Sequence, residues 1–294
     1  MALSIISNNV AQRASRDFSS ILKAYSQSLL HLSSSKRINT SADDPTGMAV
    51  SQQMRANSAA YSQGERNIED AISLVQTATG SLDVINEKLI LMKELAEEAA
   101  TGTYTDEQRT ILQSEFSSLG AEIDRIANAT KYNGIKLLDG SLSSSSVRQT
   151  SSGWSEANGG LKIHFGPGAS RNQDYYYISM PNISSNKLFN NSIPDISTIS
   201  GAESALTMID SAIVRKDNFQ SYLGGIQNRL TASLEATQSM RDSTDYAIEQ
   251  IEGVDIAEET INSTLLAVQL ETASLMLAQA NIIPEYALKL LNFD

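Results

Sequence analysis

Adjacent carboxylates are the residues of this chain whose type and spacing come nearest to a reactive site. Asp43 and Asp44 form one such pair, and Glu97 and Glu98 form another. Paired acids can serve general acid–base chemistry or bind a hard cation. Neither pair is accompanied by a nucleophile with its base or by a glycine-rich phosphate loop. We therefore interpret the first pair as a helix cap and the second as a solvent-exposed helix face, and we predict that the chain is not an enzyme.

Histidine and cysteine offer little further chemistry. The chain has no cysteine and two histidines, His31 and His164, which lie far apart in the sequence. Disulfides and thiolate metal sites are therefore excluded, and a histidine-based metal centre is not expected. His31 lies near Leu29 and Leu32 and is interpreted as a packing or surface residue. The sequence predicts no metal and no cofactor.

Charge and hydropathy exclude two classes of partner. The net charge of −12 argues against nucleic acid, because a phosphate backbone is bound through clustered Lys and Arg. No run of about 18 apolar residues is present, so no membrane-spanning helix is expected. Residues 1–13 lack a basic start followed by a long apolar stretch, which predicts that there is no cleaved signal peptide.

Both ends of the chain carry heptad patterns. Apolar residues near the N-terminus alternate steps of four and three, at Phe18, Leu22, Tyr25, Leu29 and Leu32. The same spacing recurs from Ile68 to Ala96 and from Leu112 to Ile126. Residues 261–280 carry two adjacent stripes, one through Ile261, Leu265, Val268, Thr272 and Leu275, the other through Leu266, Leu270, Ala273, Leu277 and Ala280. Such seams pack against other helices, and two stripes on one helix indicate more than one neighbour.

The middle of the chain differs from its ends. Thr105 or Asp106 can cap a helix that begins near Glu107. The region of about 141–200 is rich in Ser, Asn and Gly, and residues 161–165 and 175–180 are predicted to form two strands around a loop.

The two ends of the chain carry opposite charges. Residues 1–40 hold five basic residues and one acidic residue (net +4), whereas residues 253–294 hold one basic and six acidic residues (net −5). Opposite charges favour pairing of the two ends. We predict a mainly α fold: a long antiparallel helical bundle or coiled coil from both chain ends, with a small β-hairpin insertion.

Five ordered blocks of the sequence resemble those of bacterial flagellins. Residues 1–10 resemble the family's N-terminus, and residues 32–50, LSSSKRINTSADDPTGMAV, resemble its "LSSGxRINSAxDDxAGxAI" signature. Residues 67–78 and 132–138 match the next two blocks. LAQAN at 277–281, followed by Pro284 and LKLL at 288–291, is similar to the C-terminal block. The blocks cover about 1–140 and 200–294, in the family's order.

The resemblance implies an architecture and a role. Residues 1–40 and 253–294 would form an inner-core coiled-coil domain, and residues 41–252 a rod of long helices with the β-hairpin region at about 141–200. The insertion is short, which implies that large outer domains are missing. The chain would be a structural subunit that self-assembles into the extracellular flagellar filament, exported by the flagellar type III apparatus. A hook–filament junction protein is the alternative. Heptads alone are more often an ordinary bundle core than a polymer seam, so the polymer interpretation depends on the sequence blocks.

The resemblance also implies partners and site residues. The partners would be further copies of the chain, an export chaperone, and the filament cap and hook-junction proteins. The expected polymerisation interface comprises Phe18, Leu22, Tyr25, Leu29, Leu32, Leu265, Val268, Leu275 and Leu277. In many flagellins the stretch that matches residues 89–96 is contacted by the flagellin-sensing Toll-like receptor; the corresponding residues here are Leu91, Lys93, Glu94 and Leu95, with Glu115 on the following helix. Leu91 stands where the family has an arginine, which implies weak receptor binding.

The serine-rich segment is a candidate for surface modification. Its hydroxyls include Ser143, Ser144, Ser145, Ser146 and Thr150. The family places its variable outer surface in this part of the chain. We predict O-glycosylation there, with a plain flexible loop as the alternative.

Overall fold

The computed structural model describes residues 8–143, 160–171, 173–190 and 193–291. It divides into two compact units, the first formed by Met1–Ala56 with Ser243–Asp294 and the second by Asn57–Asp242. Helices α2 (Pro45–Ala100) and α5 (Ile199–Glu252) contribute to both units. The predicted inner-core boundaries at residues 40 and 253 stay a prediction about the assembled protein.

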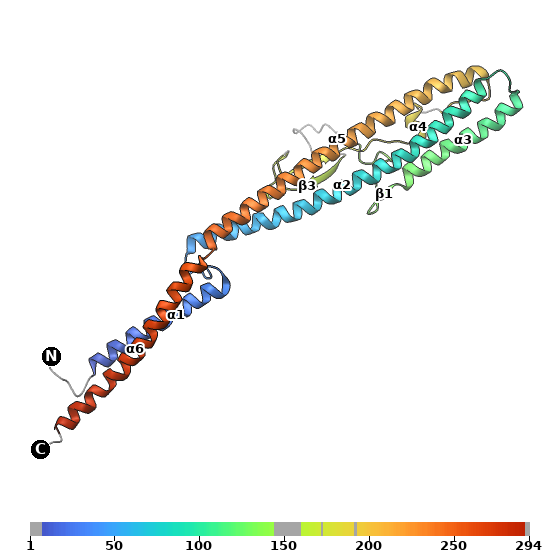
Figure 1. Ribbon diagram of the computed structural model, residues 1–294. Coiled ribbons are helices and arrows are strands. Elements are labelled where there is room, and N and C mark those ends of the chain that lie inside the picture. Colours follow the sequence, from blue (N-terminus) through green and yellow to red (C-terminus); the bar gives the residue numbers. More distant parts are fainter. Residues whose placement is uncertain (1–7, 144–159, 172, 191–192, 292–294) are drawn as a thin grey trace, which may run out of the picture. The chain divides into compact units, whose positions relative to one another are not determined.

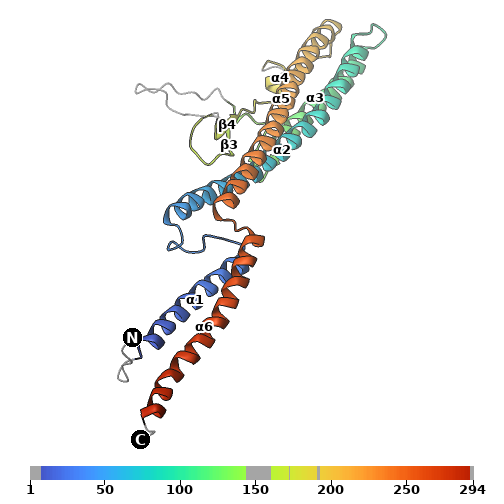
Figure 2. The ribbon, with the colours of Figure 1, turned by 60° about the vertical axis from the view of Figure 1, so that its left-hand side comes forward.

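The first unit is built on two antiparallel helices, α1 (Asn9–Ser34) and α6 (Ile256–Leu291), which lie side by side in Figures 1 and 2. The Asn8 amide donates a hydrogen bond to the Ala280 carbonyl at 2.8 Å. At the other end of the pair, His31 Nδ1 lies 3.7 Å from Glu259 Oε1. Asn8 also caps α1 by accepting a hydrogen bond from the Ala11 N–H.

The seam between these helices has the spacing of a coiled coil. The less exposed residues of α1 include Ala11, Ala14, Phe18, Ile21, Tyr25, Ser28 and Leu32; those of α6 include Ser263, Leu266, Leu270, Ala273, Leu277 and Ala280. Each set steps by three and four residues, so each follows one side of its helix. Both series contain small as well as large residues, which lets side chains interdigitate.

The second unit is a bundle of α2, α3 (Asp106–Ala129) and α5, seen at the upper right of Figure 1. The heptad residues of α2 form its core, since Ile68, Val75, Leu82, Leu89 and Met92 are fully buried. Burying a side chain of this size stabilises the fold by roughly 1.5–3 kcal/mol. The predicted mainly α fold with a small β insertion is confirmed.

Polar residues fix the turn between α2 and α3. Thr105 accepts a hydrogen bond from the Gln108 N–H, and the Gln108 side chain accepts one from the Thr105 N–H, which completes a capping box. The predicted cap at Thr105 is confirmed. Arg109, only 3% exposed, donates hydrogen bonds to the Ala99 and Thr101 carbonyls. It thereby supplies donors to backbone carbonyls at the C-terminal end of α2, where a helix leaves such groups without helical partners.

Two β-hairpins cover part of the helices. β3 (Leu161–His164) and β4 (Tyr175–Ile178) pair antiparallel, close to the strands expected at 161–165 and 175–180. A smaller hairpin, β1 (Lys131–Tyr132) with β2 (Ile135–Lys136), follows α3 and was not predicted from the sequence. Its turn residues Asn133 and Gly134 have φ of 49° and 81°, the left-handed values that tight hairpin turns require. A short helix, α4 (Ser185–Leu188), follows β4.

Candidate functional site

The apolar surface of α6 is only half covered within the chain. The stripe through Leu266, Leu270, Ala273, Leu277 and Ala280 faces α1. The second predicted stripe faces outward: Ile261, Leu265, Val268 and Leu275 are 70%, 52%, 56% and 65% exposed. Large side chains exposed in a row are typical of a surface that binds another protein. α6 therefore has one stripe paired with α1 and one without a partner among the described residues.

Helix α1 divides the predicted interface in the same way. Phe18, Tyr25 and Leu32 are half-buried in the seam with α6. Leu22 and Leu29 point away from it and are each 43% exposed. The nine predicted interface residues therefore fall into a seam set (Phe18, Tyr25, Leu32 and Leu277) and an outer set (Leu22, Leu29, Leu265, Val268 and Leu275). Only the outer set is placed to contact another molecule while the pair stays intact.

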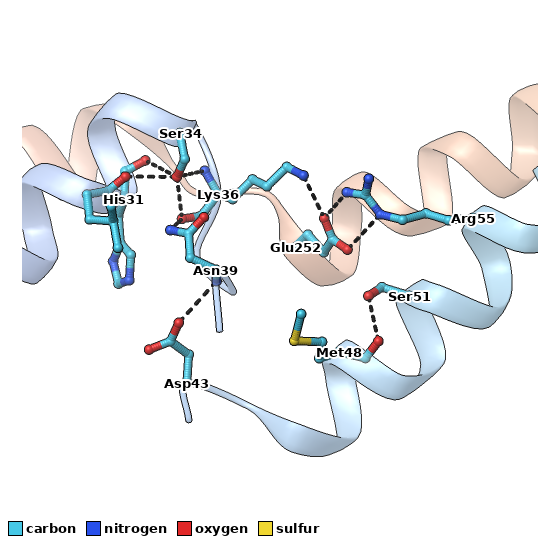
Figure 3. A network of polar contacts seen from close by, with 10 residues as sticks. His31, Ser34, Lys36, Asn39, Asp43, Met48, Ser51, Arg55 and Glu252 are labelled. Atoms are coloured by element: carbon cyan, nitrogen blue, oxygen red, sulfur yellow. Dashed lines mark hydrogen bonds and ion pairs between the residues drawn. The ribbon is translucent and has the colours of Figure 1, made fainter. Parts of the chain in front are cut away.

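A polar network joins chain segments that are distant in sequence (Figure 3). Glu252, 5% exposed, forms a bidentate hydrogen-bonded ion pair with Arg55 and lies 3.3 Å from Lys36 Nζ. The hydrogen bonds from Arg55 are the main reason that the pKa of Glu252 is lowered from 4.5 to about 2, aided by Ser51 and Lys36 and opposed by burial. The same bonds raise the pKa of Arg55.

Backbone contacts continue this network. The Arg37 N–H donates to the Glu252 carbonyl at 2.6 Å, and the Arg37 guanidinium donates to the Ile251 carbonyl at 2.7 Å. The segment that connects α1 to α2 is thus bound to the end of α5. Sequence reasoning missed this cluster, because Arg55 and Glu252 are 197 residues apart and neither belongs to a recognisable local motif.

The paired carboxylates have structural partners. Asp44 accepts hydrogen bonds from the Thr46 and Gly47 N–H groups at the start of α2, which confirms the predicted cap. Asp43 accepts from the Thr40 and Asn39 N–H groups, and these bonds lower its pKa. Glu97 is exposed on α2. A hydrogen bond to Glu98 raises the pKa of Tyr104 in the adjoining turn.

The predicted receptor stretch lies on α2 of the second unit. Leu91 is 41% exposed, and Glu94 and Glu115 are also exposed. Leu95 is half-buried, and Lys93 Nζ lies 2.6 Å from Asp210 Oδ1 on α5. Lys93 is therefore already engaged in an ion pair within the chain.

The predicted modification site lies largely beyond the described residues. Ser144, Ser145, Ser146 and Thr150 fall outside them, and Ser143 is partly exposed after a turn in which its N–H donates to the Gly140 carbonyl. Within the described ranges, no cluster of three or more His, Asp or Glu side chains could hold a metal ion. None of the helices in that part of the chain is long and apolar enough to span a membrane.

Comparison with known proteins identifies relatives over nearly the whole chain. The model of the bacterial flagellin N-terminal helical region matches residues 5–143, and that of the C-terminal helical region matches residues 206–291. A flagellin of Halalkalibacterium halodurans is 32% identical, covering 98% of this chain and 99% of the relative. The flagellar filament 41 kDa core protein of Borreliella burgdorferi is 30% identical, covering 97% of this chain and 98% of the relative.

A solved structure supports the same fold. A flagellar hook-associated protein from Vibrio parahaemolyticus superposes with a TM-score of 0.56 at 19% identity, covering 72% of this chain and all of that protein. At that identity the likeness shows the fold alone. The two relatives named above are a flagellin and a flagellar filament core protein, and the two family models together cover both helical ends. With two terminal helices paired in a seam and the matched regions in the expected order, the chain belongs to the bacterial flagellin family.

Proposed function

We propose that this flagellin, a structural subunit of the extracellular flagellar filament, polymerises through the outer set Leu22, Leu29, Leu265, Val268 and Leu275. The observation that carries the proposal is the second heptad stripe of α6, which keeps coiled-coil spacing and yet stays exposed while the first stripe is paired with α1. Burying each such side chain against a neighbouring copy would contribute roughly 1.5–3 kcal/mol before the cost of association.

The role is mechanical, and we propose no enzymatic activity. A filament requires contacts between two different surfaces of the subunit, because such contacts need not close into a ring. The outer stripe of α6 and the outer face of α1 are two such surfaces. Their opposite charges, basic on the N-terminal segment and acidic on the C-terminal one, would orient the contact more than strengthen it.

We also propose that the terminal pair is only marginally stable in the monomer and gains stability on assembly. Its seam contains several small residues, including Ala14, Ser28, Ala273 and Ala280, so the isolated pair buries little apolar surface. A weakly folded pair suits export of an unfolded chain through the flagellar type III apparatus. An export chaperone that covers the exposed stripe of α6 before assembly, and the cap and hook-junction proteins at the filament ends, are the further partners we propose.

Sedimentation and electron microscopy test the interface. Wild-type monomer nucleated with salt should give long filaments, and Leu275→Asp should not, because assembly would bury an unpaired charge. The monomer of this variant should melt as the wild type does, since Leu275 is 65% exposed. Leu270→Asp, on the paired stripe, should instead reduce the helicity of the monomer. Normal filaments from Leu275→Asp would refute the outer-set assignment.

A further inference from the structure

His31 is the only histidine of the first unit. The chain has two histidines and no cysteine, and the other histidine, His164, belongs to the second unit. Histidine ordinarily gains or loses its proton between pH 5 and 8, whereas carboxylates, lysine and arginine ordinarily titrate outside that range. The His31 side chain is 15% exposed and contacts α6 from α1. A change in its charge therefore acts on the contact between the two terminal helices.

The α1–α6 seam is polar where His31 lies. Ser28, three residues before His31 on α1, is 2% exposed, and Ser263, four residues beyond Glu259 on α6, is 8% exposed. The Ser28 hydroxyl and His31 Nε2 are buried without a hydrogen-bond partner among the described residues. A serine buries far less apolar surface than a leucine at the same place in a seam. The strength of this end of the pair therefore depends on its polar and charged groups.

Two carboxylates face the imidazole, one from each segment that packs against it. Glu259 on α6 places its Oε1 atom 3.7 Å from His31 Nδ1 and is itself 15% exposed. Asp43, in the connection between α1 and α2, accepts a hydrogen bond from Gln27 Nε2 at 2.9 Å. Gln27 lies four residues before His31, so the two side chains are neighbours on one face of α1 and Asp43 lies next to that face. The pKa of Asp43 is lowered mainly by backbone hydrogen bonds, first that of Thr40, and a charge on His31 lowers it further.

The other charged groups near this site do not neutralise the two carboxylates. Lys36 is paired with Glu252 at 3.3 Å, and Arg37 is bound to backbone carbonyls at the end of α5. Asp255 and Glu258, at the start of α6, are exposed and add further negative charge. Among the described residues, neither carboxylate that faces the imidazole has a lysine or arginine at ion-pair distance. A protonated imidazole is therefore the cation that fits this site.

We propose that His31 is a pH-sensitive contact that strengthens the α1–α6 pair when its imidazole is protonated. A neutral imidazole 3.7 Å from a carboxylate forms neither a hydrogen bond nor an ion pair with it, whereas an imidazolium attracts both Glu259 and Asp43. The stabilisation is therefore present below about pH 6.5, where histidine ordinarily titrates, and is lost as the pH rises through that value. It is also lost well below pH 5, where the carboxylates take up protons. An ion pair near the surface typically changes an equilibrium constant roughly two- to fivefold.

The contact also bears on assembly. This consequence rests on the proposed function, in which the terminal pair gains stability when the filament forms. Because the filament is extracellular, the pH of its surroundings acts on any subunit that adds to it. Mild acidification should favour the paired form of α1 and α6 and thereby assembly.

Amide hydrogen exchange of the full-length monomer measures the opening of α1 and α6 directly. The exchange is followed at about pH 5.5 and about pH 8.0 at one ionic strength and is corrected for its intrinsic dependence on pH. We expect the opening constant of the wild-type pair to be roughly two- to fivefold smaller at the lower pH. His31→Asn carries no charge at either pH, so its ratio should be close to one. His31→Lys carries a charge at both, so its ratio should also be close to one, with the protection at the higher pH raised.

Two further variants assign the effect to the proposed pair. His164→Asn, in the second unit, is the control and should keep the wild-type ratio. Glu259→Gln removes the carboxylate on α6 and should reduce the ratio, which provides a test that leaves His31 itself in place. A wild-type ratio of one would overturn the proposal, and so would an undiminished ratio in His31→Asn or Glu259→Gln. Failure of the wild type to polymerise at either pH would count instead against the proposed function, because the exchange is measured on the monomer.

Discussion

Glu252 shows how one residue can hold together segments that the sequence separates widely. Arg55, Lys36 and Ser51 all contribute to the low pKa of its carboxylate. A shift from 4.5 to about 2 corresponds to roughly 3 kcal/mol of preference for the ionised form. The side chains of Arg55 and Lys36 are 40% and 41% exposed, so solvent screening reduces the effective stabilisation to about 1–2 kcal/mol.

The first prediction is that Glu252→Gln lowers the stability of the monomer in a pH-dependent way. Because the folded-state pKa is depressed, the stabilisation by Glu252 is fully present above about pH 4.5 and is lost as the pH falls towards 2. The difference in melting temperature between wild type and Glu252→Gln should be greatest near pH 7 and should shrink below pH 4.5. Circular dichroism measures it, with the exposed Glu249→Gln as control. A difference that grows on acidification would refute the assignment.

Leu91 is the residue at which the receptor stretch departs from the family pattern. Leucine has no hydrogen-bond donor, whereas arginine offers five in a planar group. A missing charge-assisted interfacial bond costs on the order of 2–5 kcal/mol, which corresponds to roughly thirty-fold to several thousand-fold in affinity. Lys93, bonded to Asp210, is already committed to a partner within the chain.

The second prediction is that monomeric wild-type protein activates the flagellin-sensing Toll-like receptor weakly and that Leu91→Arg restores activation in part. A cell reporter assay measures it. Ile90→Arg adds the same charge at a neighbouring residue of similar exposure, 45% against 41%, and should have no effect because it projects from another side of the helix. Full potency from the wild type would rule out the predicted weak recognition.

At the scale of elements, the β3–β4 hairpin is positioned by the close approach of its backbone to α2. A Cβ atom at residue 64 would lie 2.1 Å from the Phe165 carbonyl oxygen, so only glycine allows the contact. The neighbouring Asn67 amide donates to the His164 carbonyl at 2.7 Å. A glycine in the middle of a long helix thus has a packing role that outweighs its low helix propensity.

The third prediction compares two glycine-to-alanine substitutions in α2. Gly64→Ala should destabilise the second unit, because the overpacking cost of about 1–3 kcal/mol exceeds or cancels the gain of up to ~1 kcal/mol in helix propensity. Gly80→Ala has no atom within 4 Å of the added Cβ and should stabilise it by about 1 kcal/mol. Denaturant unfolding of the two variants measures the opposite signs. An equal gain in both would show that the hairpin does not press on Gly64.

The elements that the sequence predicted are those defined by local periodicity. The heptads of α2 and the cap at Thr105 depend on residues close in sequence. The pairing of β3 with β4 also joins segments that are close in sequence. The hairpin of β1 and β2 is too short to show alternation, and α4 spans a single turn. Two stripes were visible on α6, but which of them α1 covers depends on long-range pairing. The Glu252 cluster was invisible for the same reason.

At the scale of the whole molecule, the second unit contains its own buried core, whereas the first is a seam of two helices. The described part of the second unit includes the fully buried residues of α2 and Phe116 and Ile123 of α3. In the first unit, α1 and α6 bury the apolar seam residues of each other. Removing either helix therefore exposes the seam residues of the other. The two units are therefore expected to respond very differently to truncation.

The last prediction is that deleting residues 1–40 or residues 253–294 leaves a soluble helical protein that cannot form filaments. Either deletion removes part of the outer set and one side of the α1–α6 seam, so the remaining terminal helix should lose helicity, because single helices without tertiary packing are marginal in water. The core of the second unit lies within Asn57–Asp242 and should keep its cooperative melting transition. Far-UV circular dichroism should therefore show a helical loss larger than the deleted residues alone explain, and sedimentation should show no polymer at concentrations where the full chain assembles. Normal polymerisation by either truncation would disprove the role of the terminal helices.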